Sequence, residues 1–212
     1  MRTDELIDSL AANLQPVDRG RVSRRFRIGL AIGLAAALGE MFLFIGPHQA
    51  LDARGLAGFF LQCLFTLGLV ATTVMFLLRA ARPGTEVRGF LALASFPVGA
   101  IVAFVAVGLA LAHHLISGAR IVDKSAVACL FYIPLFATVP FATVVWALRT
   151  GAPTHLTRAG AAAGLAAGAL SAAACALPCG NELFMAIALF HGLAIEICAG
   201  LGAKVGPRIL RW

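Results

Sequence analysis

Six long apolar runs constrain the fold of this chain more than any other feature of its sequence. The hydrocarbon core of a bilayer is about 30 Å thick, so a helix that rises about 1.5 Å per residue needs roughly 20 apolar residues to cross it. Runs of about that length cover residues 26–46, 59–78, 90–112, 126–148, 159–177 and 183–203. The predicted fold class is therefore all-α, a polytopic membrane protein with a six-transmembrane-helix bundle.

The composition and the short connections favour the same interpretation. Hydrophobic residues make up 60% of the chain and charged residues 13%, with a mean hydropathy of +0.92. A soluble domain does not need so much apolar material to fill one core. The polar start lacks a clean cleavage site, so we expect the first run to stay in the protein rather than leave as a signal peptide. We divide the chain into an N-terminal partner-binding segment, residues 1–25, and a transmembrane domain, residues 26–212.

The distribution of Lys and Arg predicts the orientation, because cationic loops remain on the cytoplasmic side. One side carries fourteen of them: Arg2, Arg19, Arg21, Arg24, Arg25, Arg27, Arg79, Arg82, Arg88, Arg149, Arg158, Lys204, Arg208 and Arg211. The other side carries three, Arg54, Arg120 and Lys124, which completes the total of seventeen. Both termini are therefore predicted to be cytoplasmic. The net charge of +7 follows from this topology, and no basic stripe interleaved with aromatic residues indicates direct binding of nucleic acid.

The first fifteen residues predict a short amphipathic helix that ends at Pro16. At 100° per residue one face gathers four apolar side chains: Leu6, Ile7, Leu10 and Leu14. Asp4 and Glu5 lie off this stripe, near the positive end of the helix dipole. The stripe must be buried against the bundle, the lipid surface or another protein. Helices on anionic membrane surfaces carry basic polar faces, so the acidic face favours a protein partner.

Four of the five cysteines fall near the predicted outer ends of the helices: Cys63, Cys129, Cys175 and Cys179. Cys198 is placed toward the cytoplasm. A single buried cysteine commonly packs as a small hydrophobic side chain. Clustering at one depth instead indicates thiols that form a disulfide or bind a soft metal ion. The sequence leaves both interpretations open.

Several stretches together resemble one family. They are the start RTDELIDSLAANLQPV, the lone cysteine of the run 126–148, the stretch LPCGNELF and the end GPRILRW. Their order and spacing are similar to those of the NrsF-type six-helix anti-sigma factors of the bacterial inner membrane. The resemblance implies that the N-terminal segment sequesters an extracytoplasmic-function sigma factor. It also implies that Cys129 and Cys179 sense a periplasmic redox or metal stress.

Other kinds of function find less support in the residues. No paired catalytic carboxylates, activated nucleophile or phosphate-binding loop is visible, so we predict neither an enzyme nor a cofactor. The alternative is a small transporter or channel that uses the intramembrane carboxylates Glu40 and Glu196. Glycine faces in the runs 26–46 and 159–177 predict close helix packing, within the bundle or in a homo-oligomer.

Reporter fusions test the predicted topology. A reporter that is active only in the cytoplasm should be active after Trp212, and one that is active only in the periplasm should be active near Arg120. The reverse pattern would contradict the orientation and the compartment assigned to each thiol.

Overall fold

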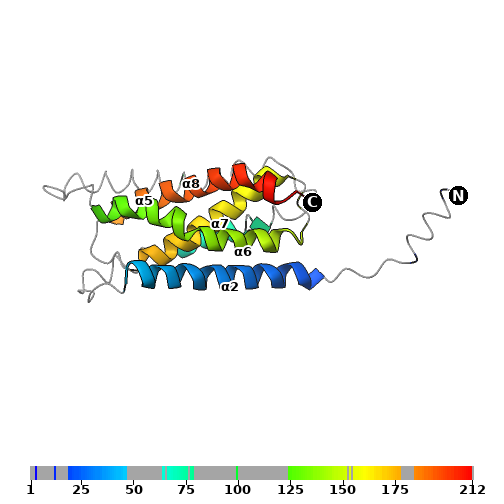
Figure 1. Cartoon of the computed structure of the whole chain (residues 1–212), viewed down its shortest axis with the longest axis horizontal. Coiled ribbons are helices and arrows are strands. Elements are labelled where there is room, and N and C mark those ends of the chain that lie inside the picture. The colour runs from blue at the N-terminus through cyan, green and yellow to red at the C-terminus, as the bar shows by residue number, and fades with distance from the viewer. Residues whose placement is uncertain are drawn as a thin grey trace.

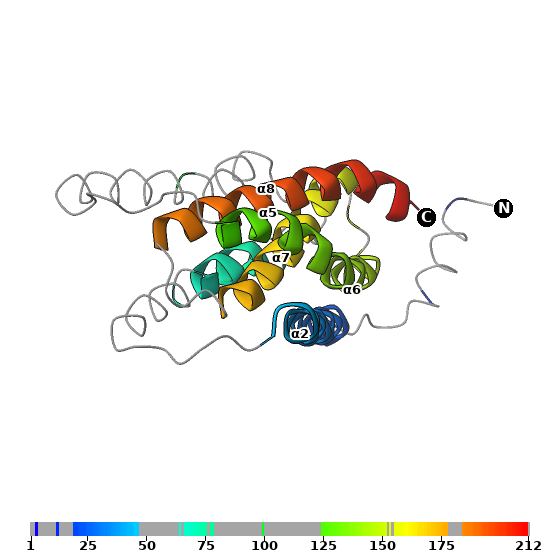
Figure 2. The same cartoon turned by 60° about the vertical axis from the view of Figure 1, so that its left-hand side comes forward.

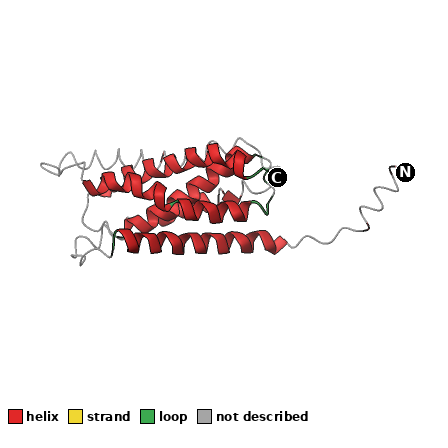
Figure 3. Ribbon diagram, viewed as in Figure 1, coloured by secondary structure: helices red, strands yellow, loops and turns green. Residues whose placement is uncertain are grey.

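The described part of the chain consists of helices and the short turns next to them. The computed structural model describes residues 19–46, 66–75, 124–151, 155–177 and 184–211, together with 3, 12, 64, 77–78, 99 and 153. The helices are α2 (Arg19–Phe44), α5 (Lys124–Phe136), α6 (Thr138–Leu148), α7 (Leu156–Ala176) and α8 (Phe184–Ile209). Figure 3 shows no strand among these residues, which confirms the all-α prediction for them.

Four stretches are long and apolar enough to cross a membrane: Ser23–Phe44, Val127–Leu148, Leu156–Ala176 and Leu189–Ile209. They correspond to the first, fourth, fifth and sixth predicted runs. Only part of the second run is described, as a shorter apolar helix over Thr66–Met75. The third run lies outside the described residues except for Gly99. Six spans therefore remain a prediction, of which the structure supplies four.

The four spans alternate in direction. In Figure 1, α2 and α7 run one way, whereas α5, α6 and α8 run the other way. The start of α2 and the end of α8 consequently lie at the same end of the bundle, which we call the terminal end. At the opposite end α2 ends at Phe44, and Gly46 follows with a φ of 78°, a left-handed conformation that favours glycine. The Gly46 amide donates to the Met41 carbonyl, 3.2 Å away, and closes the helix.

Helix α7 occupies the centre of the bundle because its side chains are small. Its sequence is mostly alanine and glycine, and buried residues make up 89% of its membrane-length stretch, against 28–44% in the other three. It packs most extensively on α8 and also on α6, α2 and α5. In Figure 2, α2 is viewed nearly along its axis beside α6, with α7 and α8 crossing above it.

Glycines from both helices form the crossing of α7 and α8, which we call the glycine seam. A Cβ on Gly160 would meet the Gly202 carbonyl oxygen and, at 2.7 Å, the Gly206 Cα. A Cβ on Gly164 would meet the Cys198 carbonyl oxygen. These obstacles are backbone atoms, which cannot rotate away as a flexible side chain can. The predicted small-residue face of α7 therefore packs inside the bundle, and Gly29 and Gly33 of α2 pack likewise against α6.

The fourth predicted run is broken at Ala137, where α5 ends and α6 begins. Pro134 and Pro140 flank the break and lack the amide hydrogens that would continue the helical ladder. Thr138 compensates locally, because its hydroxyl donates to the Leu135 carbonyl at 2.8 Å. On either side of the break the chain packs differently: α5 lies mainly on α8, and α6 mainly on α2 and α7.

The outer surface of the described helices is apolar, as a hydrocarbon environment requires. Exposed fractions reach 83% at Leu43, 72% at Phe131 and 52% at Leu201. Large apolar side chains exposed in this number would be unusual on a soluble monomer. The small residues lie inside, on α7, and large aliphatic and aromatic residues lie on the outer surface of the surrounding helices, where a bilayer would contact them.

The glycine seam predicts opposite effects for two similar substitutions. Gly164→Ala places a methyl group against the backbone of α8, and such overpacking typically costs about 1–3 kcal/mol. Gly200→Ala has no heavy atom within 4 Å of its Cβ and should stabilise the helix by about 0.5–1 kcal/mol. Thermal unfolding of both variants in detergent measures the difference. Equal melting temperatures for the two variants would contradict the seam.

Candidate functional site

Two cysteines and a carboxylate lie at the end of the bundle opposite the termini, which we call the thiol end. Cys129 on α5 is 6% exposed and Cys175 on α7 is 0% exposed, and both are thiols rather than disulfides in this structure. The ionisable neighbours of the Cys175 thiol are Cys129 and Glu40. Three helices, α2, α5 and α7, therefore each contribute one ionisable side chain to the same region.

Cys179, the predicted partner of Cys129, lies outside the described residues. Helix α7 ends at Ala176, three residues before it. The contact between Cys129 and Cys179 thus stays a prediction, and Cys63 also lies outside the described part. What the structure adds is Cys175, which the resemblance did not single out. The spacing of Cys175 and Cys179, four residues apart, was the signal in the sequence, since such residues share one helical face.

The described residues at the thiol end offer two thiols but no preformed metal centre. Among the described residues, no three His, Cys, Asp or Glu side chains lie close enough to hold a metal ion. The thiols are shielded from solvent, so an oxidant or a soft metal ion reaches them only if the helix ends separate. A covalent or metal link formed there would join α5 to α7 and alter the packing of the bundle.

The two intramembrane carboxylates lie on α2 and α8, which share α7 as a neighbour but do not pack extensively on each other. Glu40 belongs to α2, which packs mainly on α6 and α7, whereas Glu196 belongs to α8, which packs mainly on α7 and α5. One oxygen of each, Oε2 of Glu40 and Oε1 of Glu196, is buried without a hydrogen-bond partner among the described residues. The described helices do not bring the two carboxylates together, so the carboxylate pathway of the transporter alternative gains no support from them.

The predicted partner-binding residues Asp4, Glu5, Leu6, Ile7, Leu10 and Leu14 lie outside the described part of the chain. Thr3 and Ala12, within the same predicted helix, are helical and exposed. The amphipathic stripe therefore stays a prediction. The structure does show that α2 begins at Arg19, within the segment 1–25, so the basic run belongs to a membrane-length helix.

Contacts at the terminal end connect the start of α2 and the end of α8 to α6. The Arg25 guanidinium lies over the Trp146 ring, with 5.4 Å between its Cζ atom and the ring centroid. This is within the range of a cation–π interaction. Arg149, just after α6, donates from Nη2 to the Ile209 carbonyl at 2.6 Å. Helix α6 and the residue after it thus contact both the start of α2 and the end of α8.

Comparison with known proteins agrees over the full length of the chain. Residues 10–212 match the family described as "Negative regulator of sigma F" (NrsF). The chain is 31% identical over 216 residues to the "Probable anti-sigma-F factor NrsF" of Azospira oryzae, with all of both chains covered. It is 30% identical over 224 residues to the "Anti-sigma-F factor NrsF" of Caulobacter vibrioides, again with complete coverage of both. No solved structure matches the chain. With a matching family over residues 10–212 and two full-length relatives, the chain belongs to the NrsF family of negative regulators of a sigma factor.

Proposed function

We propose that this protein is a multi-pass anti-sigma factor of the bacterial inner membrane. Its N-terminal segment, residues 1–25, binds an extracytoplasmic-function sigma factor and keeps it from RNA polymerase. Cysteines sense a redox or soft-metal stress in the periplasm, and this signal releases the sigma factor. The observation that carries the proposal is the full-length similarity to two proteins named as anti-sigma-F factors.

The arrangement of the helices supports different roles for the two ends of the bundle, partner binding at one and sensing at the other. The start of α2 and the end of α8 lie together at the terminal end (Figure 1), where the sequence also places most of the arginines. If this end is cytoplasmic, a sigma factor held by residues 1–25 lies next to the basic start of α2. The thiol end, with Cys129 and Cys175, then faces the periplasm, where disulfides form and persist.

The signal has to travel through the helices, since the connections are too short for a folded outer domain. A disulfide contributes about 2–4 kcal/mol, and each 1.4 kcal/mol changes an equilibrium constant tenfold. One link could therefore shift a two-state bundle by roughly 30- to 1,000-fold. That is enough for partial to nearly complete release if the link forms in only one arrangement.

The partner-binding stripe predicts the effect of a double substitution, Leu6→Asp with Leu10→Asp. Each buried leucine contributes about 1.5–3 kcal/mol, so the pair should weaken sigma-factor binding roughly a hundredfold or more. Binding is measured with the full-length protein in detergent micelles and each tagged extracytoplasmic-function sigma factor of the source organism. The control is Ser9→Asp with Ala12→Asp, which adds the same charge on the other side of the predicted helix. Equal binding by both double variants would contradict the stripe.

The sensing thiols predict a second result. Cys129→Ser and Cys179→Ser should each abolish induction of the target genes by oxidant or by a soft metal ion, since either change removes one end of the link. Cys198→Ser is the matched control, because that thiol packs on Gly168 at the glycine seam. Immunoblots check that all variants reach equal levels. A full response in the double variant would reduce both cysteines to packing residues.

A further inference from the structure

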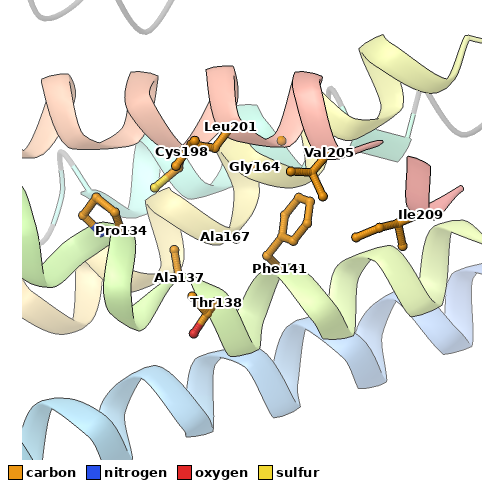
Figure 4. Close-up of a pocket in the computed structure, with 11 residues that line it drawn as sticks. Pro134, Ala137, Thr138, Phe141, Gly164, Ala167, Cys198, Leu201, Val205 and Ile209 are labelled. Carbon is orange, nitrogen blue, oxygen red and sulfur yellow. The ribbon is translucent and has the colours of Figure 1, made fainter. Parts of the chain in front are cut away.

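An apolar groove lies between α6 and α8, where the break at Ala137 turns the chain from α8 toward α2. Its volume is about 310 Å³. Gly164 and Ala167 of α7 form the floor together with Cys198, and these residues are buried. Figure 4 shows Phe141 and Cys198 facing the space from opposite helices. The groove is thus a direct product of the proline-flanked break and of the small residues of α7.

The groove opens on the outer surface of the described bundle rather than toward its centre. Its edges include Thr138, Leu201 and Ile209, and all three side chains are exposed. The Thr138 hydroxyl is already satisfied by the Leu135 carbonyl, so it requires no water or polar ligand. An enclosed apolar cavity of roughly 150 Å³ is already large enough to bind benzene. This groove has about twice that volume, and its natural occupant is a hydrocarbon chain.

The length of the groove and the basic residues at one of its ends indicate which kind of hydrocarbon chain it binds. Along α8 the groove extends from Cys198 to Ile209, eleven residues or about 16 Å at 1.5 Å per residue. Half of a hydrocarbon core is about 15 Å thick, so the groove runs from headgroup level to near the bilayer midplane. At the headgroup end the Arg149 guanidinium is held beside Ile209 by its 2.6 Å hydrogen bond. Lys204 and Arg208, which precede Ile209 on α8, are also exposed.

We propose that this groove binds one acyl chain of an anionic phospholipid, whose headgroup is held by Arg149 and Arg208 at the terminal end. The proposal rests on the membrane insertion that the proposed function requires, but not on sigma-factor binding. A cation near the surface contributes about 1 kcal/mol toward an anionic lipid. The bound chain would fill the space between the α5–α6 break and the glycine seam, and so it would support the packing that connects the two ends of the bundle.

Native mass spectrometry of the full-length protein tests the site, with phosphatidylglycerol and phosphatidylcholine offered together in mixed micelles. The wild type should retain one phosphatidylglycerol in preference to phosphatidylcholine. Thr138→Phe should remove both lipids, because the added ring fills the mouth of the groove. Val139→Phe is the matched control, since Val139 is exposed on the same helix but does not line the groove. Equal retention by the two variants would overturn the proposal, as would dimers of the wild type that Thr138→Phe abolishes.

The headgroup site is tested by Arg149→Gln, which should lower the preference for phosphatidylglycerol about fivefold. Arg27→Gln, an exposed cation of α2, should leave that preference unchanged, and identical behaviour of both variants would overturn the headgroup assignment. If Thr138→Phe does not fold, Val205→Phe provides the measurement, because Val205 lines the same groove from α8. Equal retention of lipid by Val205→Phe and Val139→Phe would overturn the occupant. Sigma-factor binding is measured on the same samples. If the protein retains the lipid but does not bind a sigma factor, that result counts against the proposed function only.

Discussion

The glycine seam between α7 and α8 is the interaction on which the rest of the structure depends. Helices in a bilayer gain no hydrophobic free energy from leaving lipid for one another, so close packing has to hold them together. Gly160, Gly164, Gly202 and Gly206 allow backbone atoms of α7 and α8 to approach directly. Because α7 has almost no large side chains, α2, α5 and α6 also reach it. A bulky residue at the seam would push α7 and α8 apart and so disturb the packing of every helix that contacts α7.

The central position of α7 also determines what lies at each end. Cys175, in its last turn, comes close to Cys129 of α5 and Glu40 of α2. The opposite end of α7 begins at Leu156, beside the helix ends joined by Arg149 and Arg25. One helix thus spans the distance between the thiols and the end of the bundle where α2 begins, and α2, α5, α6 and α8 all pack on it.

Much of the fold could be predicted, because the thickness of a bilayer makes the length of an apolar run decisive. The runs 26–46, 126–148, 159–177 and 183–203 all correspond to described helices. Boundaries were less predictable where charged residues continue a helix beyond the hydrocarbon. Helix α2 begins at Arg19, and α8 continues through Lys204 and Arg208 to Ile209, because long basic side chains reach the headgroups without ending the helix.

The candidate site was less predictable than the helices. The sequence indicated that several thiols share one depth, but which of them meet depends on which helices pack together. The proximity of Cys129 and Cys175 follows from the contact of α5 with α7, and no periodicity in the sequence encodes that choice. The two prolines of the fourth run were visible, yet the groove that their break opens also requires the small residues of α7 opposite it.

The glycine seam has a mechanical consequence. Interlocked side chains fix the axial register of two helices, because sliding would drive knobs out of their holes. A seam of bare backbone presents few such obstacles along the helix axis, although it resists separation strongly. The glycines therefore do not by themselves fix the register of α7 against α8, and at the terminal end α8 is also held to the residue after α6 by the hydrogen bond from Arg149 to the Ile209 carbonyl. A small change at either end would be felt as translation along the seam, with the bundle remaining closed.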